Sequence, residues 1–374
     1  MDKTINKPIL KKKYEAIPSK SILHRALICA AFSDTQTVFP VTNIGDDVLA
    51  TVRCLEALGI SIDCSAGGFV VTPLVSKQPV SAGQVLDCGD SATTYRFMKE
   101  IVDTFEIDCE LTGSGKLMER VTSNAPTSQT VSGKLLANGA KGKDFKFAFK
   151  RDQVSRPYID MTADVMRHFG STGYISPGRY IIEGDWSQAA VWMTAAAVSR
   201  KENTEKGFVT ISGLNLRSKQ GDRDFLKILR SFGAAVSTEG NNVHVISGKE
   251  LRGIEYKMSD NPDLVPLTAV LGSFAKGPTL LTGIAFLRNK ESDRIESTAD
   301  MIRELGGSVD VGENFMLIYG TDTTGGLKGG IVNTYKDHRI AMAAAVAAFG
   351  LENEIIIQNA ECISKSYPNF WEVF

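Results

Sequence analysis

Residues 17–32 read IPSKSILHRALICAAF and combine two features that conflict. The second half is apolar and rich in small residues, which predicts a buried helix. The opening turns instead carry Lys20, His24 and Arg25. A helix N-terminus already has about half a positive charge, so cations there cost up to about 1 kcal/mol each. For a single helix, a solvated first turn explains this pattern; the rest of the chain favours another explanation.

The same pattern recurs in six segments, each with a polar or charged opening that leads into a small-residue, apolar helix. These segments are 19–32, 90–102, 127–140, 186–198, 262–275 and 336–349. Amphipathic helices that end in Gly and lead into alternating strand residues lie between them, at 46–64, 164–170, 222–238 and 293–311. Gly supplies the left-handed cap of such a helix. The repeat predicts six helix–strand units in two domains of three, an α/β protein with its helices gathered inside each domain.

The second repeat is predicted to be about half the length of the others. Only VTSNAP, residues 121–126, separates Arg120 from Thr127, where a Gly-ended helix should stand. The third repeat is trimmed around 168–180, and the sixth leaves little room for a closing helix at 369–374. A natural compact variant, an engineered deletion and a decayed paralogue would each explain this.

Composition excludes several classes of protein. The 374 residues exceed what one hydrophobic core usually supports, so two domains are expected. A net charge of −1 argues against a general nucleic-acid or membrane-surface binder. The six cysteines show no CxxC spacing, so we expect them to be reduced and buried and expect no metal site. No apolar leader or membrane-length run is present, which predicts a cytoplasmic protein.

Cations recur at equivalent points of the repeats. Lys290 and Arg294 are predicted on one face of a helix start, and Arg339 falls in the first turn of another helix. Arg120 and Lys365 follow predicted strands. Two like charges about 6 Å apart repel by about 3 kcal/mol at an effective dielectric constant of 20. We therefore expect a polyanionic ligand, held by these cations and by helix N-termini, to neutralise the cluster.

Separate surface salt bridges would explain any one of these cations, but they explain six at equivalent positions less well. Two acidic residues strengthen the case for a reactive site. Glu291 lies beside Lys290, and Asp263 stands at the start of a repeat helix, so both are placed to exchange protons.

Nine motifs follow one another along the chain: PSKSILHRA (18–26), LDCGDSATTYRF (86–97), LTGSGKLMER (111–120), SRPYIDMTADVM (155–166), YIIEGDWSQAA (180–190), QGDRDFLKILRSFGA (220–234), NKESDRI (289–295), YKDHRIAMA (335–343) and KSYPNFWEV (365–373). In this order they resemble the motifs of the 5-enolpyruvylshikimate-3-phosphate synthase family, from about Lys20 to the C-terminus. Such an ordered set is highly specific.

The resemblance implies a two-domain inside-out α/β barrel of six βαβαββ repeats, here with the second repeat shortened, whose domains close over the active site. Residues 18–183 would form the N-terminal domain on the shikimate 3-phosphate side. Residues 1–17 plus 184–374 would form the C-terminal domain on the phosphoenolpyruvate side. The implied reaction transfers the carboxyvinyl group of phosphoenolpyruvate to the 5-hydroxyl of shikimate 3-phosphate on the way to chorismate and the aromatic amino acids. It implies no metal or other cofactor, no nucleic-acid or membrane partner, and a cytoplasmic monomer.

The resemblance also implies roles for the motif residues. Shikimate 3-phosphate would contact Ser21, Arg25, Thr127, Ser128, Gln129, Ser155, Tyr158, Asp263 and Lys290. Phosphoenolpyruvate would contact Lys20, Asp90, Ala92, Arg120, Gln129, Arg294, Arg339 and Lys365. In catalysis, Asp263 would take the 5-hydroxyl proton, while Glu291, aided by Lys290, would protonate C3 of phosphoenolpyruvate; Lys20 would complete the catalytic set.

Three positions depart from the family pattern. Asp90 stands where many members have Asn, and its carboxylate would weaken phosphoenolpyruvate binding unless it is protonated or paired with a cation. Ala92 stands where the motif has Gly, so its methyl group predicts weak inhibition by glyphosate. Phe286 replaces a frequent Asn near the shikimate phosphate.

Other functions remain open from the sequence. One is an enolpyruvyl transferase with a different acceptor, such as UDP-N-acetylglucosamine, although the SRPY and SQ motifs favour shikimate 3-phosphate. Another is a non-catalytic relative whose trimmed repeats reflect relaxed constraint. An RNA-terminal-phosphate cyclase, built on similar repeats, is disfavoured by the neutral net charge and the lack of nucleotide-handling residues.

Overall fold

The structure is a computed structural model that describes residues 1–65, 67–74, 79, 83–122, 127–145, 155–199 and 208–374. Its contacts divide the chain into two units. Unit 1 contains Met1–Ile17, Gly184–Ser364 and Phe374, and unit 2 contains Pro18–Glu183 and Lys365–Val373. The sequence analysis grouped 365–373 with residues 184–364 instead. These residues contact unit 2, where the Lys365 ammonium lies 2.7 Å from the Asp90 carboxylate.

Unit 2 is built around a group of packed helices. They are α1 (Lys20–Ala31), α2 (Asp46–Ala57), α3 (Ala92–Phe105), α5 (Ser128–Ala140) and α6 (Arg156–His168), with the short helices α4 (Leu117–Val121) and α13 (Phe370–Val373). Helix α1 contacts α2, α5 and α6, and α3 contacts α2 and α5. Of the segment 121–126, which was predicted to lack a Gly-ended helix, Val121 is the last residue of the five-residue α4, and residues 123–126 lie outside the described part of the chain.

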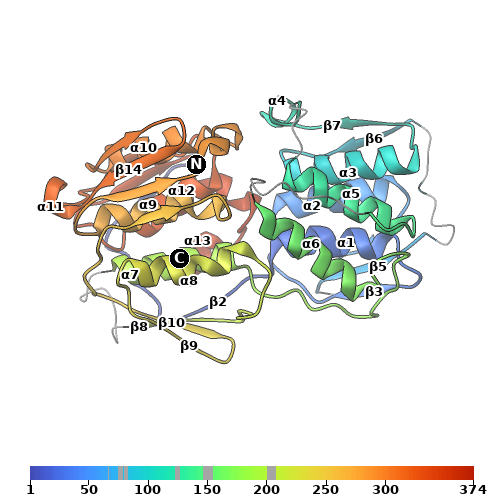
Figure 1. Ribbon diagram of the computed structural model, residues 1–374, viewed down its shortest axis with the longest axis horizontal. Helices are drawn as coiled ribbons and strands as arrows, with labels where there is room; N and C mark the ends of the chain where they lie inside the picture. The colour runs from blue at the N-terminus through green and yellow to red at the C-terminus, as the bar shows by residue number, and fades with distance from the viewer. Residues whose placement is uncertain (66, 75–78, 80–82, 123–126, 146–154, 200–207) are drawn as a thin grey trace. The chain divides into compact units, whose positions relative to one another are not determined.

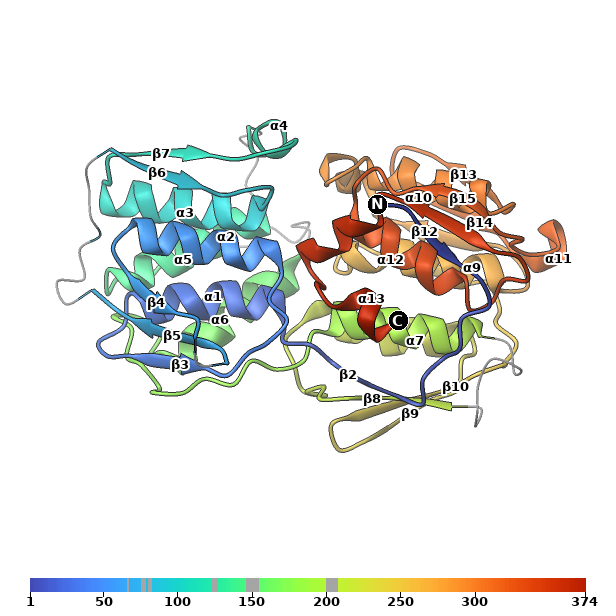
Figure 2. The ribbon, with the colours of Figure 1, turned by 180° about the vertical axis from the view of Figure 1, so that it is seen from behind.

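Two groups of strands flank these helices (Figures 1 and 2). Strands β3 (Thr37–Phe39), β5 (Phe69–Thr72) and β4 (Ser61–Asp63) form an antiparallel sheet in the order β3-β5-β4. Strands β6 (Gln84–Asp87) and β7 (Cys109–Thr112) form a parallel pair on the opposite side of the helices. The helices of unit 2 therefore lie between its strands.

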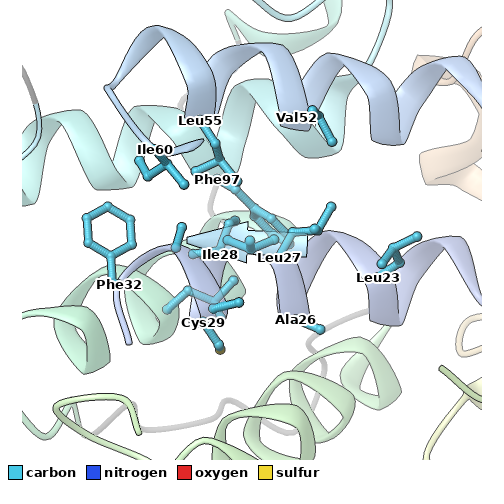
Figure 3. Packing of buried hydrophobic residues seen from close by; sticks show 14 of the residues in the cluster. Leu23, Ala26, Leu27, Ile28, Cys29, Phe32, Val52, Leu55, Ile60 and Phe97 are labelled. Atoms are coloured by element: carbon cyan, nitrogen blue, oxygen red, sulfur yellow. The ribbon is translucent and has the colours of Figure 1, made fainter. Parts of the chain in front are cut away.

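The core of unit 2 fixes the direction of α1. Leu23, Leu27 and Ile28 of α1 pack against Leu55 of α2 and Phe97 of α3 (Figure 3). All five side chains are buried, and each stabilises the fold by about 1.5–3 kcal/mol relative to an exposed position. Helix α1 cannot shift without opening this packing, so the first turn of α1 is held in place.

The inner helices of unit 1 are buried on every side. They are α7 (Trp186–Val198), α9 (Val265–Phe274) and α12 (His338–Ala347), and each contacts the other two. Every residue of α7 and of α12 is buried, as the Ala-rich sequence predicts for a helix enclosed by other elements. The outer helices are α8 (Phe225–Ser231), α10 (Arg294–Glu304) and α11 (Thr321–Thr324).

Short 3-10 helices join the main elements of unit 1. They are η2 (Gly221–Asp224), η3 (Pro262–Leu264), η4 (Ala285–Asn289) and η5 (Ala360–Lys365), whose last residue belongs to unit 2. Several of the residues with predicted functions lie on these short helices or directly after them.

Two sheets of unit 1 share one strand pattern. The first runs β2 (Lys13–Glu15), β8 (Phe208–Ser212), β10 (Asn242–Ile246) and β9 (Val236–Glu239). The second runs β11 (Glu255–Lys257), β12 (Thr279–Thr282), β14 (Phe315–Tyr319) and β13 (Ser308–Val311). In both, the first pair is parallel and the other pairs are antiparallel. The helices α7, α9 and α12 lie between these sheets (Figures 1 and 2).

The third sheet of unit 1 contains part of the same pattern. Strand β15 (Gly330–Asn333) pairs in parallel with β16 (Ile355–Gln358), which pairs antiparallel with β1 (Lys3–Ile5). In unit 2, the strands β6 and β7 correspond to the parallel pair of this pattern. Among the residues described, no antiparallel strand is added to them. The β6–β7 sheet therefore has two strands among the residues described, where the sheets of unit 1 have three or four.

Glycine ends the outer helices as predicted. Gly59, Gly170, Gly233 and Gly306 follow α2, α6, α8 and α10, with φ angles between 83° and 92°. Only Gly adopts this conformation without strain, so these residues set where each helix stops.

The cysteines differ in part from the expectation. Cys29, Cys54 and Cys88 are buried and free, but Cys64 is exposed because it follows the edge strand β4. Over the described residues, none of the helices has the length and apolar character needed to cross a bilayer.

Candidate functional site

In unit 2, three predicted cations form an alternating chain of ion pairs with two carboxylates. The Lys20 ammonium lies 2.8 Å from Asp47, which lies 3.9 Å from Lys365. Lys365 in turn lies 2.7 Å from Asp90, and Asp90 lies 2.6 Å from Arg120. We call these five residues the charge ladder. It joins the beginnings of α1, α2 and α3 to α4 and to the end of η5.

The expectation that a bound ligand must neutralise these cations is wrong for the free protein. Each of the three cations already has a carboxylate partner within its own unit. Asp47 lies in the first turn of α2, where a carboxylate is favourable by about 0.3–1 kcal/mol. The cost of placing Lys20 at a helix start is therefore offset by a neighbouring acid. The alternative raised for Asp90, pairing with a cation, is the one observed.

Arg25 pairs with no acid among the residues that the structure describes. Its guanidinium is buried and donates hydrogen bonds to the Thr162 hydroxyl at 2.7 Å and to the Ser21 carbonyl at 2.6 Å. It also lies 5.1 Å from the centre of the Phe97 ring, in a cation–π arrangement. Burial lowers the pKa of Arg25 to about 10, so it stays charged at neutral pH. Only 1% of Arg25 is exposed, so a ligand would reach it only after its neighbours moved.

The remaining predicted residues of unit 2 lie at helix starts. Thr127 caps α5, where its side chain accepts a hydrogen bond from the Thr130 amide, and Ser128 is the first residue of this helix. Ser155 precedes α6 with a left-handed φ of 62°. Such a conformation is unusual outside Gly and often marks a functional position. Tyr158 accepts a hydrogen bond from Arg25 through its carbonyl.

Gln129 and Ala92 lie close to the charge ladder. The Gln129 side chain accepts a hydrogen bond from Arg96 and donates one to Thr93 at 2.8 Å. Arg96 also donates to the carbonyl of Arg120. Ala92 is the half-buried first residue of α3, two positions after Asp90. The structure thus connects Gln129 to the ladder through Arg96.

In unit 1, Arg294 lies at the centre of a buried cluster of charges. Its guanidinium lies 2.9 Å from Asp263, 2.8 Å from Glu291 and 2.9 Å from Asp337. Only 1% of Arg294 is exposed, and these three acids raise its pKa above the ordinary arginine value although burial alone would lower it. Arg339 joins the cluster with a 3.1 Å contact to Asp263. We call these five residues the arginine cluster.

Asp263 is bound through both oxygen atoms. One oxygen accepts from Arg294 and the other from Arg339. Burial by itself would raise the pKa of Asp263, but the charges of Arg339, Lys290 and Arg294 hold it well below its usual value. Asp263 is consequently an ionised but weak base in the free protein.

Lys290 does not lie on the helix predicted for it. Helix α10 begins at Arg294 because Asp293 caps it, accepting hydrogen bonds from the amides of Ile295 and Glu296. Lys290 follows η4 in an extended conformation, with its ammonium 5.9 Å from the centre of the Phe286 ring. Its charge still acts on Asp263.

Two acids that pair with these cations, Asp47 and Asp337, were not among the predicted site residues. Asp47 and Asp337 each stand at a helix start, the position where an acid caps or stabilises a helix, so this signal was available. The same signal was available for Asp222, which lies in the first turn of η2. It is buried beside Asp263 and Asp185, and burial together with these charges raises its pKa to about 7 against the opposing charge of Arg339.

Two solved structures share the fold of this chain. A solved EPSP synthase from Acinetobacter baumannii superposes with a TM-score of 0.77, at 23% identity over 100% of this chain and 97% of that one. The enolpyruvyl transferase NikO from Streptomyces tendae superposes with a TM-score of 0.73, at 14% identity over 99% of this chain and 95% of that one. Both likenesses concern the fold.

Sequence comparison defines the family. The family model of EPSP synthase (3-phosphoshikimate 1-carboxyvinyltransferase) matches residues 7–122 and 122–374. Curated relatives named 3-phosphoshikimate 1-carboxyvinyltransferase come from Methanosphaerula palustris, at 32% identity over 96% of this chain and 95% of theirs, and from Clostridium kluyveri, at 31% identity over 99% and 96%. The chain therefore belongs to the EPSP synthase family.

Proposed function

We propose that this chain transfers the carboxyvinyl group of phosphoenolpyruvate to the 5-hydroxyl of shikimate 3-phosphate, with release of phosphate. The observation that carries the proposal is the family match, which extends over residues 7–374. The reaction belongs to the synthesis of chorismate and the aromatic amino acids. The chain acts as a cytoplasmic monomer and needs only its two small-molecule substrates.

The charge ladder supplies the anion-binding groups of unit 2. Lys20, Arg120 and Lys365 bind the phosphate and carboxylate of phosphoenolpyruvate, and bidentate Arg–phosphate contacts give such a site both strength and orientation. The carboxylates Asp47 and Asp90 hold these cations in the absence of substrate. When substrate binds, its phosphate and carboxylate groups replace the Asp47 and Asp90 carboxylates as partners of these cations. The cations are therefore paired both before and after binding.

Residues at the helix starts hold shikimate 3-phosphate. Thr127, Ser128 and Ser155 present hydroxyl groups and helix N-termini, which favour phosphate. Ser21, Arg25, Gln129 and Tyr158 complete this set on α1, α5 and α6, while Asp263 and Lys290 add contacts from unit 1.

The arginine cluster supplies the acid and base. Asp263 removes the 5-hydroxyl proton as the oxygen attacks C2 of phosphoenolpyruvate, while Glu291, aided by Lys290, protonates C3. Loss of phosphate and of a proton from C3 then gives the enol ether product. Because Arg294 and Arg339 hold both oxygens of Asp263, anion binding to these arginines frees Asp263 and strengthens it as a base.

The finer architecture is part of the same proposal. The strand pattern shared by the two four-stranded sheets of unit 1 supports a barrel of βαβαββ repeats, with helices inside and sheets outside. The two-stranded β6–β7 sheet and the division of the family match at Thr122 support a shortened second repeat. Residues 18–183 and residues 1–17 plus 184–374 each form one domain of three repeats, with 365–373 attached to the first.

The test is release of inorganic phosphate from phosphoenolpyruvate by the purified chain. We expect release with shikimate 3-phosphate, and none with UDP-N-acetylglucosamine or without an acceptor. Release with UDP-N-acetylglucosamine alone would identify a transferase with a different acceptor. Calorimetric binding of shikimate 3-phosphate without turnover would identify a non-catalytic relative and overturn the proposal.

A further inference from the structure

Asp90 lies between solvent and the two cations that it pairs with. Its side chain is 39% exposed, whereas those of Arg120 and Lys365 are 7% and 11% exposed. The carboxylate accepts a hydrogen bond from Arg120 through one oxygen and from Lys365 through the other. An anion that arrives from solvent therefore meets Asp90 before it meets either cation.

The carboxylate of Asp90 is not needed to position these cations. The backbone carbonyl of Asp90 accepts hydrogen bonds from the same two groups, at 2.8 Å from Arg120 and 2.8 Å from Lys365. The GSGK turn supports that backbone, since the Ser114 amide donates to the Gly89 carbonyl at 2.8 Å. Removing only the charge of Asp90 leaves these contacts in place.

Asp47, the other acid of the ladder, differs from Asp90 in its exposure to solvent and in the partner of its backbone carbonyl. Its side chain is 8% exposed, and its backbone carbonyl accepts from the Thr94 hydroxyl and not from a cation. Asp47 thus belongs to the packed junction of α2 and α3. Asp90 is the acid of the ladder that can swing into solvent.

We propose that Asp90 is a specificity-determining residue, whose carboxylate occupies the anion position on Arg120 and Lys365 and yields it only to a doubly charged phosphate group. This rests on the proposed function, in which the ladder binds phosphoenolpyruvate. A phosphate ester carries about −1.5 to −2 charges, so it competes well with one carboxylate, whereas a monoanion such as chloride does not. Asp90 lowers the affinity of the site and, in return, excludes small monoanions.

The test compares Asp90→Asn with Glu119→Gln. Glu119 is an exposed residue of α4, next to Arg120 in sequence, and lies outside the ladder, so its substitution removes one negative charge without opening the site. Inorganic phosphate is the probe, and its binding is measured by calorimetry in the absence of turnover. Phosphate binding therefore tests Asp90 whether or not the chain is an active transferase.

We expect Asp90→Asn to lower the phosphate dissociation constant about threefold to tenfold, because two partly exposed ion pairs no longer compete. Chloride should also compete with phosphate in this variant and not in the parent protein. Glu119→Gln should change neither. Unchanged or weaker phosphate binding in Asp90→Asn would overturn the proposal, as would an equal gain in both variants. Asp90→Ser serves as a second variant if the first does not fold, with the same expected results.

Discussion

The arginine cluster of unit 1 is centred on a cation that is closed to solvent, whereas the charge ladder of unit 2 contains one acid that is partly exposed. Arg294 is 1% exposed and contacts three carboxylates, one of which, Asp337, is completely buried. In the charge ladder, each contact joins one cation to one acid, and Asp90 is 39% exposed. Ion pairs of the first kind are costly to break, while those of the second kind exchange readily with a ligand. We therefore expect stability to depend more on the arginine cluster, and anion exchange to occur more readily on the charge ladder.

The largest difference between the two groups should appear when one arginine is removed from each. Arg294→Met leaves Asp263, Glu291 and Asp337 without their common partner, which should cost about 3–5 kcal/mol of stability. Arg120→Met should cost about 1 kcal/mol or less, because Asp90 is partly exposed and keeps Lys365. Urea denaturation of both variants measures this, and equal losses would contradict the comparison.

A second contrast separates activity from stability within the ladder. Lys20→Ala should lower kcat by more than about a hundredfold, because the proposed function assigns Lys20 to phosphoenolpyruvate binding, while the thermal midpoint stays close to that of the parent. The stability should change little because Asp47 still has a cationic neighbour in this variant, the ammonium of Lys365 at 3.9 Å. Lys99→Ala, which removes an exposed lysine paired with Asp103 on α3, is the control and should affect neither. A large fall in the midpoint for Lys20→Ala would mean that the lysine is structural.

A third prediction concerns the pH dependence of the buried acid beside the arginine cluster. The pKa of Asp222 is raised from 3.8 to about 7, so the folded state retains a proton that the unfolded chain releases between these values. Asp222 therefore reduces stability as the pH rises through this window, and its cost is complete above about pH 7. Asp222→Asn should raise the thermal midpoint by several degrees at pH 8 and leave it unchanged at pH 4. The same shift at both pH values would exclude ionisation as the cause.

The smallest expected effect is a change in glyphosate inhibition when Ala92, two positions after Asp90, is replaced. Ala92→Gly removes the methyl group at the start of α3, so glyphosate should inhibit about tenfold more strongly, with a smaller change in the KM for phosphoenolpyruvate. The inhibition constant for glyphosate measures this. Ala57→Gly, at a half-buried position of α2, controls for the helix destabilisation of about 1 kcal/mol that Gly brings. Strong inhibition of the parent protein would show that the methyl group does not exclude glyphosate.

Local patterns predicted the secondary structure well. The Ala-rich segments at 186–198 and 336–349 became the buried helices α7 and α12, because such helices have no polar face to expose. Gly59 and Gly306 end their helices in the left-handed conformation that Gly adopts without strain. Because this depends on the residue type alone, the sequence predicts it. Lys290 was misplaced because the capping side chain of Asp293 starts α10 four residues later.

Long-range pairing of charges was not predictable in the same way. Cations were recognised at helix starts, but Asp47 is 27 residues from Lys20, and Asp90 is 275 residues from Lys365. No local pattern indicates that these residues meet, so the sequence suggested unpaired cations where the fold supplies acids. Motifs predicted which residues form the candidate site, whereas the pairing of their charges depends on the tertiary structure.

The most direct test is a crystal structure of the chain with shikimate 3-phosphate and inorganic phosphate bound. We predict that phosphate oxygens replace the Asp90 carboxylate on Arg120 and Lys365, and that the Asp90 carbonyl keeps its contacts with both. A phosphate bound elsewhere, with the Asp90 carboxylate still joining the two cations, would contradict the exchange of internal for external anions.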